Sequence, residues 1–255
     1  MRVAAIQHDI AWEDAATTRA RVAPMIAGVV ATGARLVVLP EMFATGFSMR
    51  TEVTAESPDG PTTSFLVDRA AEHGVWLAAT VATQDAAAAR PVNRFVLAGP
   101  SGQLHDYVKV HTFTYAGESD HFDRGETVNT FVIEGVRVTP LVCFDLRFAD
   151  LFWEAAAATD LYVVPANWPS ARRHHWQTLL RARAIENQAY VMGVNRVGDD
   201  GTGLSHAGDS AVVDPMGEVL ASAAGEEAIL VTEIDPARVT EVRERFPFQA
   251  DRRPH

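Results

Sequence analysis

The residue with the clearest chemical potential is Cys143, the single cysteine of the chain. It follows the apolar run 138–142 and is followed by the polar residues Asp145 and Arg147. This pattern predicts a strand that ends in a sharp turn and a new helix. A thiol at such a turn lies beside unpaired backbone N–H groups, which stabilise a thiolate and a developing oxyanion. The alternative is a buried core thiol, because a free cysteine packs as a small hydrophobic residue.

Two further polar residues stand at the ends of predicted strands. Glu41 follows the apolar run 36–39, and Lys109 follows the run 106–108. A thiol needs a base to accept its proton, and an acyl-transfer intermediate needs a cation or N–H donors for its oxyanion. Taken singly, each residue is also explained as a solvated surface charge. If the three strand ends converge, glutamate, lysine and cysteine supply the parts of an acyl-transfer site.

At this point the chain resembles the nitrilase superfamily, the carbon–nitrogen hydrolases that use a Glu-Lys-Cys triad. The matching segments follow the family's order and span nearly the whole chain: residues 3–7, 39–41, 107–111, 117–118, 143–148, 165–169, 183–188 and 208–210. Phe144 stands where the family commonly has tyrosine, and Ala149 replaces a frequent proline. Neither change removes a catalytic group, because an oxyanion hole uses the backbone N–H of residue 144.

The resemblance implies both a fold and a mechanism. The fold is α/β, a four-layer α-β-β-α sandwich whose two sheets pack face to face. Glu41 takes the proton of Cys143, and the thiolate attacks a carboxamide carbon to give an intermediate held by Lys109 and the Phe144 N–H. Ammonia leaves, and Glu41 then activates water to hydrolyse the thioester. Glu118 matches a supporting fourth acid that holds Lys109 or the substrate amide; its alternative is a solvated loop glutamate.

The substrate class follows from the segments around these residues. Residues 40–47 and 166–169, with 175–177, look most like the ω-amidase branch, which hydrolyses the terminal amide of 2-oxo dicarboxylic acid monoamides. The resemblance places Phe47, Asn167 and Trp168 at the substrate. N-carbamoyl amino acids and simple aliphatic amides remain alternatives, because all share the catalytic core, and nitriles are the weaker option.

An arginine is expected to select a substrate that carries a carboxylate. Arg147 lies four residues after Cys143, so its guanidinium can reach a group bound near the sulfur. A fork of N–H donors binds a carboxylate bidentately. Arg172, past another predicted strand end, is the second candidate. The alternative for Arg147 is a structural ion pair with Asp145 or Asp150.

Other polar residues predict no further chemistry. His111 is expected to be a hydrogen-bonded neutral imidazole rather than the base of a Cys-His pair. His174 and His175 are adjacent and do not share a helix face, so a metal site is not expected. The glycine-rich segment 198–203 does not follow a strand and open a helix as dinucleotide-binding loops do, and is predicted to be a turn, with the rim of the site as one location for it. We therefore expect no metal and no cofactor.

Composition indicates one globular domain, residues 1–255. Hydrophobic residues make up 47% and charged residues 22%, and the formal charge of −11 disfavours nucleic acid as a partner. No apolar run predicts a signal peptide or a membrane span, so no membrane partner is expected. A single reactive thiol fits the reducing cytoplasm. A small-molecule amide is the expected partner.

Strands and helices alternate along the predicted fold. Residues 14–32 are predicted as a helix that Pro24 should kink or split, because proline lacks the N–H donor. Other predicted helices are 61–73, 150–159 and 176–190, and predicted strands are 2–8, 35–39, 75–83, 93–98, 104–108, 127–133, 136–142, 160–165, 190–194, 211–213, 218–220 and 228–234. Residues 111–126 are predicted to be a loop over the site.

The family resemblance also predicts a homodimer through the outer helices that contain residues 148–158 and 181–186; plain core packing is the alternative for these helices. Two other function classes are compatible with parts of the sequence. One is a binding protein with an inactive site, which intact Glu41, Lys109 and Cys143 argue against. The other is a cysteine protease or acyltransferase, which would turn over peptides or use amine acceptors.

Overall fold

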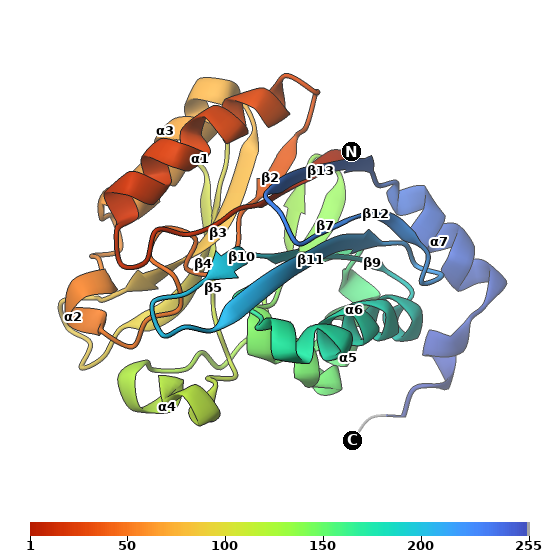
Figure 1. The fold of residues 1–255 in the computed structure, drawn as a ribbon. Coiled ribbons are helices and arrows are strands. Elements are labelled where there is room, and N and C mark those ends of the chain that lie inside the picture. Colours follow the sequence, from red (N-terminus) through yellow and green to blue (C-terminus); the bar gives the residue numbers. More distant parts are fainter. Residues whose placement is uncertain (254–255) are drawn as a thin grey trace.

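The computed structural model describes residues 1–253. Two mixed β-sheets lie face to face, and helices cover the outer face of each sheet (Figure 1). Helices α1 (Ala15–Val30) and α3 (Pro61–His73) cover the first sheet, whereas α5 (Ala149–Ala155) and α6 (Arg173–Asn187) cover the second (Figure 1). The four-layer α-β-β-α sandwich expected from the sequence is confirmed.

The first sheet has six strands. In order across the sheet they are β13 (Ala228–Glu233), β1 (Arg2–Gln7), β2 (Leu36–Val38), β3 (Trp76–Thr83), β4 (Val92–Ala98) and β5 (Leu104–Val108). β1, β2 and β3 are parallel, and β4 and β5 are antiparallel to their neighbours. Two reversals of direction leave β5 parallel to β2 and β3. The carboxyl ends of β2 and β5 therefore lie at the same end of the sheet.

The second sheet contains the segment that leads to Cys143. Its strands are β10 (Val197–Asp199), β11 (Ser205–Val213), β9 (Tyr190–Asn195), β8 (Leu161–Ala166), β7 (Val136–Pro140) and β6 (Phe131–Ile133), with β12 (Val219–Ala224) paired to β11. β7, β8 and β9 are parallel. Cys143 follows β7 and Asn167 follows β8, so both leave the sheet at the same end.

Alternation of side chains along the buried strands explains the layers. In β1, Val3 and Ala5 belong to the core that also contains β7 and β8, whereas Ala4 and Ile6 pack with Val22 of α1. Successive residues of a strand point to opposite faces. Strands that are apolar at every position can therefore lie between a second sheet and a layer of helices.

The helices differ from the predictions in several places. α1 runs unbroken through Pro24, so of the two predicted effects of this proline, a kink or a split, the split is wrong. Asp14 caps α1, because its carboxylate accepts a hydrogen bond of 3.0 Å from the Thr17 N–H. Helix α7 (Pro236–Arg245) was not predicted, since only Val239 and Val242 give it a buried face. The shortest helices are α2 (Thr51–Thr54) and α4 (Glu118–His121).

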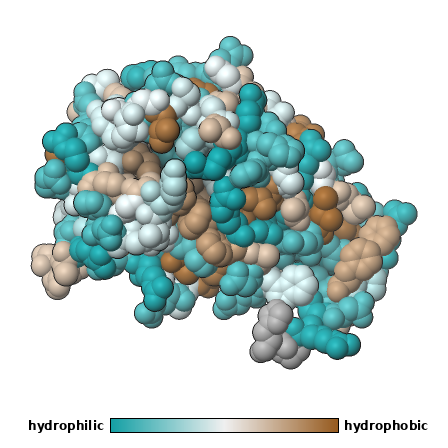
Figure 2. Space-filling model, turned by 60° about the horizontal axis from the view of Figure 1, so that its bottom comes forward, coloured by the Kyte–Doolittle hydropathy of each residue, from teal (hydrophilic) through white to brown (hydrophobic). Residues whose placement is uncertain are grey.

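The strand predictions hold for the core and fail at some ends. The hairpin around Glu134 and Gly135 exists, but its first arm pairs only over Phe131–Ile133 rather than from residue 127. Both turn residues have positive φ angles, 48° and 81°. On the face shown in Figure 2, hydrophilic residues dominate and hydrophobic ones form small separate groups. Among the described residues, no helix is both long and apolar enough to cross a membrane.

Candidate active site

Cys143 lies at a sharp turn between β7 and a short 3₁₀ helix, η2 (Cys143–Arg147). Its φ angle is +45°, in the left-handed region that residues other than glycine rarely adopt. Met42, directly after Glu41, has a φ angle of +42°. Strain of this kind persists only where the surroundings enforce it, and it is concentrated at functional sites. The two strained residues mark the positions where the thiol and the carboxylate leave their strands.

Asp145 holds the Cys143 turn in place. Its buried carboxylate accepts hydrogen bonds from the Val142 N–H at 2.9 Å, the Tyr107 hydroxyl at 2.8 Å and the His111 N–H at 2.8 Å. The first donor belongs to the turn, and the other two flank Lys109 in the sequence. Asp145 therefore connects the segment of the thiol to the segment of the lysine.

Glu41, Lys109 and Glu118 form one buried cluster. Lys109 Nζ donates to Glu41 Oε1 at 2.9 Å and to Glu118 Oε2 at 2.8 Å. All three side chains are almost completely buried. Glu118 opens α4, within the segment predicted as a loop over the site, and also accepts a hydrogen bond of 2.5 Å from the Phe113 N–H. The structure thus brings together the acid, the amine and the second acid that the sequence singled out.

Asn93 belongs to the same cluster and was not predicted. Its Nδ2 donates to Glu41 Oε1 at 2.8 Å and to Glu118 Oε1 at 3.3 Å. A signal was present in the sequence, because the hairpin of β4 and β5 places Asn93 opposite Lys109. The Lys109 N–H indeed donates to the Asn93 carbonyl at 3.0 Å.

The charges of the cluster set the protonation of the thiol. Burial lowers the pKa of Lys109, but the Glu118 and Glu41 carboxylates outweigh it and raise that pKa above its ordinary value, so the ammonium stays charged. Burial first, and the Glu41 charge second, raise the pKa of the Cys143 thiol well above its ordinary value, against the effect of Lys109. The resting thiol is therefore protonated, and it needs a base to become a nucleophile.

The pKa of the second acid, Glu118, is raised above its ordinary value. Burial and the Glu41 charge raise the pKa of Glu118, while Lys109 and the Phe113 N–H lower it. Two buried carboxylates around one ammonium repel each other, so each gains from every donor that reaches it. The cluster therefore contains a carboxylate that can accept a proton and, next to it, the fixed ammonium of Lys109.

A cavity of about 290 Å³ opens onto Cys143, which is half-buried. This volume suits a small molecule rather than a polypeptide. Its lining combines the polar cluster with aromatic side chains: Glu41, Phe47, Lys109, Phe113, Tyr115, Ala116, Cys143, Phe144, Arg147, Asn167, Trp168, Pro169, Arg172, Asp200, Leu204 and His206. Asp200 belongs to the predicted glycine-rich turn, and so this turn does contribute to the rim of the cavity.

Two arginines line the cavity without a carboxylate partner among residues 1–253. The Arg147 guanidinium lies over the Trp168 ring at 4.7 Å and contacts His175 Nδ1 at 3.2 Å. The ion pair with Asp145 or Asp150 considered for Arg147 is not formed. Arg172 lies over the Phe113 ring at 5.4 Å. Burial, then the charge of Arg172, lowers the pKa of Arg147, so an anion between the two guanidinium groups would relieve their repulsion.

Asn167 connects the second sheet to the acid cluster. Its backbone N–H donates to Glu41 Oε2 at 2.9 Å, and its side-chain amide donates to the Glu41 carbonyl. Trp168 is fixed next to it, because its N–H donates to Asn195 Oδ1 at 2.8 Å. Phe47 lies next to Lys109, with its ring centroid 5.1 Å from Nζ. These predicted substrate residues all face the cavity of Cys143.

His111 lies apart from this cavity. Its ring stacks on Phe148 with centroids 3.6 Å apart, and its Nδ1 lies 3.2 Å from Asp145 Oδ1. It lines a separate hollow on the other side of Phe144. The geometry therefore does not support a Cys-His pair, and the hydrogen-bonded imidazole that the sequence predicted is what the structure contains.

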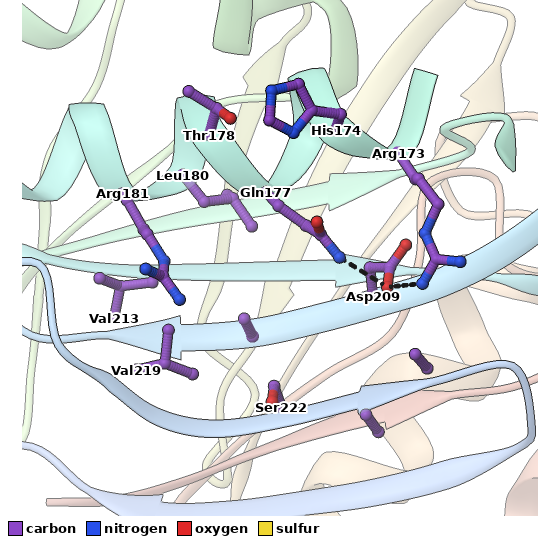
Figure 3. Close-up of a pocket in the computed structure, with 13 residues that line it drawn as sticks. Arg173, His174, Gln177, Thr178, Leu180, Arg181, Asp209, Val213, Val219 and Ser222 are labelled. Atoms are coloured by element: carbon purple, nitrogen blue, oxygen red, sulfur yellow. Dashed lines mark hydrogen bonds and ion pairs between the residues drawn. The ribbon is translucent and has the colours of Figure 1, made fainter. Parts of the chain in front are cut away.

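A larger groove, about 810 Å³, runs between α6 and strands β11 and β12 (Figure 3). Asp209 Oδ1 accepts hydrogen bonds there from Arg173 at 2.7 Å and from Gln177 at 2.9 Å (Figure 3). The groove contains no nucleophile paired with a base. Its role for the site is indirect, since Asp209 anchors the start of α6 directly after Arg172. Within residues 1–253, no three His, Cys, Asp or Glu side chains gather in a way that could hold a metal ion.

Comparison with known proteins gives a consistent result. The model of the carbon–nitrogen hydrolase family matches residues 2–244. The chain is 38% identical over 253 residues to the omega-amidase YafV of Escherichia coli (strain K12), which covers 98% of this chain and 96% of that protein. It is 36% identical to the 2-oxoglutaramate amidase of Paenarthrobacter nicotinovorans, over 91% of this chain and 82% of that one.

Solved structures agree with the fold. A CN-hydrolase superfamily protein from Xanthomonas campestris, crystallised with an arsenic adduct in its active site, matches with a TM-score of 0.95 and 36% identity. The match covers 100% of this chain and 98% of the other. Similarity therefore extends over the whole architecture, not over isolated motifs.

Proposed function

The chain belongs to the carbon–nitrogen hydrolase family, and we propose that it hydrolyses the terminal carboxamide of a small ω-amido (2-oxo) dicarboxylic acid to the acid and ammonia. The observation that supports this most directly is the cavity of Cys143, which is lined by Glu41 and Lys109 of the buried cluster and also by Arg147 and Arg172. The named amidases among its relatives point to the same class of substrate.

In the first half of the reaction, Glu41 accepts the proton of Cys143 as the sulfur attacks the carboxamide carbon. The protonated resting thiol makes this step dependent on the base. Lys109 and the Phe144 N–H stabilise the oxyanion of the tetrahedral intermediate, because fixed donors in a buried site need no reorganisation. Glu41 then gives its proton to the leaving nitrogen. Ammonia departs, and the acyl group remains on sulfur as a thioester.

In the second half, Glu41 acts as a base again. It removes a proton from a water molecule that attacks the thioester carbon, and the same two donors stabilise the second oxyanion. Collapse of this intermediate releases the acid and returns the proton to Cys143. Lys109 keeps its charge throughout, since the pKa of its ammonium is raised by Glu118 and Glu41. Glu118 acts through Lys109, which it binds with both oxygens.

The arginines provide selectivity for an acidic substrate. A carboxylate placed between Arg147 and Arg172 would be neutralised by two guanidinium groups that lie over the Trp168 and Phe113 rings. An N-carbamoyl amino acid carries a carboxylate as well and is the alternative substrate. A simple aliphatic amide uses the same catalytic residues but gains nothing from the arginine pair.

Ammonia release from a panel of amides tests the proposed function. The panel contains 2-oxoglutaramate, succinamate, an N-carbamoyl amino acid, propionamide and a nitrile. We expect the highest kcat/KM for the ω-amido acids, and less than roughly 1% of wild-type turnover for Cys143→Ser, because a hydroxyl is a much poorer nucleophile at neutral pH. A panel led by propionamide or the nitrile, or an active Cys143→Ser variant, would refute the proposal.

The assembly and location of the protein are proposed as well. We infer a homodimer formed through the outer layer, because Trp153 of α5 and Ile185 of α6 are large hydrophobic side chains with exposed fractions of 37% and 53%. Light scattering should give twice the 27.7 kDa mass of one chain, and the Ile185→Asp variant should have a lower measured mass because the dimer is weakened. The unpaired reactive thiol favours a cytoplasmic location, which cell fractionation tests.

A further inference from the structure

We propose that Asn93 is a positioning residue of this site: its amide holds Glu41 in the orientation that presents Oε2 to the Cys143 thiol, and it bridges Glu41 to Glu118. The inference rests on the part of the proposed function in which Glu41 acts as the base. It does not depend on which amide is the substrate.

The two oxygens of Glu41 have different surroundings. Oε1 accepts two hydrogen bonds, from Lys109 Nζ at 2.9 Å and from Asn93 Nδ2 at 2.8 Å. Oε2 accepts one, from the Asn167 N–H at 2.9 Å. Each carboxylate oxygen has two acceptor sites, so those of Oε1 are filled and Oε2 retains one. The Asn167 N–H and the Glu41 carboxylate both influence the pKa of the Cys143 thiol, and we therefore assign Oε2, the oxygen bound by Asn167, to the side of Glu41 that faces the sulfur.

The orientation of the Asn93 amide follows from its neighbours. Nδ2 lies within hydrogen-bond distance of a carboxylate oxygen of Glu41 and of Glu118, and the reversed amide would place an oxygen against both. Oδ1 is left buried without a partner among the described residues. An unsatisfied buried acceptor is costly, and such exceptions point to a demand elsewhere on the side chain. Here the Asn93 amide is oriented so that its NH₂ group donates to both Glu41 and Glu118.

Asn93 supplies these donors without adding charge. Among residues 1–253, Lys109 is the one ammonium in contact with Glu41 and Glu118, so the cluster has an excess of carboxylate. A second lysine would neutralise the excess but would also bring another exchangeable proton next to Glu41. An amide lowers the repulsion between the carboxylates and has no proton to exchange at neutral pH. The backbone carbonyl of Asn93 also accepts a hydrogen bond from the Lys109 N–H, so the same residue fixes the backbone of the lysine.

The test uses Asn93→Ala and Asn93→Ser, with Asn187→Ala as the matched control. Asn187 is a fully buried asparagine whose Nδ2 donates to the Arg183 carbonyl, away from the cavity of Cys143. We expect Asn93→Ala to lower kcat about tenfold to a hundredfold at nearly constant KM, because a hydrogen bond to a charged group is lost while the substrate pocket is unchanged. Asn93→Ser, which keeps a donor, should recover part of the loss.

The pH dependence separates positioning from a structural role. Loss of the Asn93 donor removes a hydrogen bond that favours an ionised base, so the acidic limb of kcat/KM should move to higher pH. The rate at which iodoacetamide modifies Cys143 does not depend on the amide substrate, and the acidic limb of its pH profile should move to higher pH as well. Asn187→Ala should leave both profiles in place even if it lowers stability.

Two results would overturn the inference. In one, Asn93→Ala loses activity and stability together, with the acidic limb of both profiles unmoved; Asn93 would then only support the fold. In the other, kcat and the profiles stay at wild-type values. If iodoacetamide modification behaves as expected while every amide of the panel is a poor substrate, the inference stands and the proposed substrate class fails.

Discussion

At Arg147, the functional and the structural interpretation make opposite predictions for a change to lysine. A lysine keeps the charge but loses the planar fork that binds a carboxylate through two parallel hydrogen bonds. We expect Arg147→Lys to raise KM for an ω-amido acid on the order of tenfold or more, a loss of roughly 1.5–3 kcal/mol, with little effect on propionamide. Initial rates with both substrates measure the difference.

Arg173→Lys is the matched control for this change. Arg173 binds Asp209 in the groove between α6 and β11 and does not line the cavity of Cys143. The Arg173→Lys change should leave the ratio of kcat/KM for the ω-amido acid to kcat/KM for propionamide unchanged. Equal losses on charged and uncharged amides for Arg147→Lys, together with a lower Tm, would assign Arg147 to the scaffold.

The residues that could be identified from the sequence are those whose types have chemistry of their own. Cys143, Glu41 and Lys109 each follow an apolar run, and the structure places all three around one cavity. Asn93 was not singled out, and Asp145 was considered only as an ion-pair partner of Arg147, because an amide and an aspartate have no distinctive chemistry of their own. Their importance depends on contacts across strands, such as Asn93 opposite Lys109, which only the register of the hairpin reveals.

Among the elements, α1 differs most clearly from expectation, because Pro24 neither splits nor ends it. Proline in a helix interior removes one backbone hydrogen bond and costs about 3 kcal/mol relative to alanine, although a stiffer unfolded chain offsets roughly 1 kcal/mol. Pro24→Ala should therefore stabilise the protein by about 1–2 kcal/mol. Thermal unfolding should show a Tm higher by about 2–4 °C per kcal/mol, with unchanged activity.

Pro61 provides the contrast. It is the first residue of α3, where the missing N–H would have no intrahelical partner. Pro61→Ala should lower the stability slightly or leave it unchanged. If both alanine variants had the same effect, the position of the proline within its helix would not be the cause.

The degree of burial explains which helices and strands can be predicted from the sequence. β3 and β8 are apolar at nearly every position and pack between a sheet and a helical layer, so their strands are evident from composition. α7 lies at the edge with two buried valines, and its amphipathic pattern is weak. Elements are predictable in proportion to how much of their surface the core covers.

For the molecule as a whole, two buried histidines predict a loss of stability in acid. Burial lowers the pKa of His8 and of His206 from 6.5 to about 4. Between these values the unfolded chain binds protons that the folded chain does not, so stability is complete above pH 6.5 and falls as the pH drops toward 4. The loss at pH 5 is roughly 2 kcal/mol per histidine.

Urea unfolding at pH 7 and pH 5 measures this loss. His8→Gln combined with His206→Gln should flatten the dependence over that window, whatever it does to the stability at pH 7. His121→Gln, on an exposed histidine, should leave the slope as it is in the wild type. An unchanged slope in the double variant would show that other groups cause the acid sensitivity.

The pairing of β1 with β13 affects how the chain folds while it is being synthesised. β1 lies between β2 and β13, and Arg2 binds Glu233, which is 231 residues further along the chain. During synthesis on the ribosome, β1 emerges long before its second neighbour exists. Until residues 228–233 are made, β1 presents an open edge that another chain can occupy. β1 therefore waits until residue 233 has been made before its second edge is covered, and in this interval the open edge favours pairing with other chains.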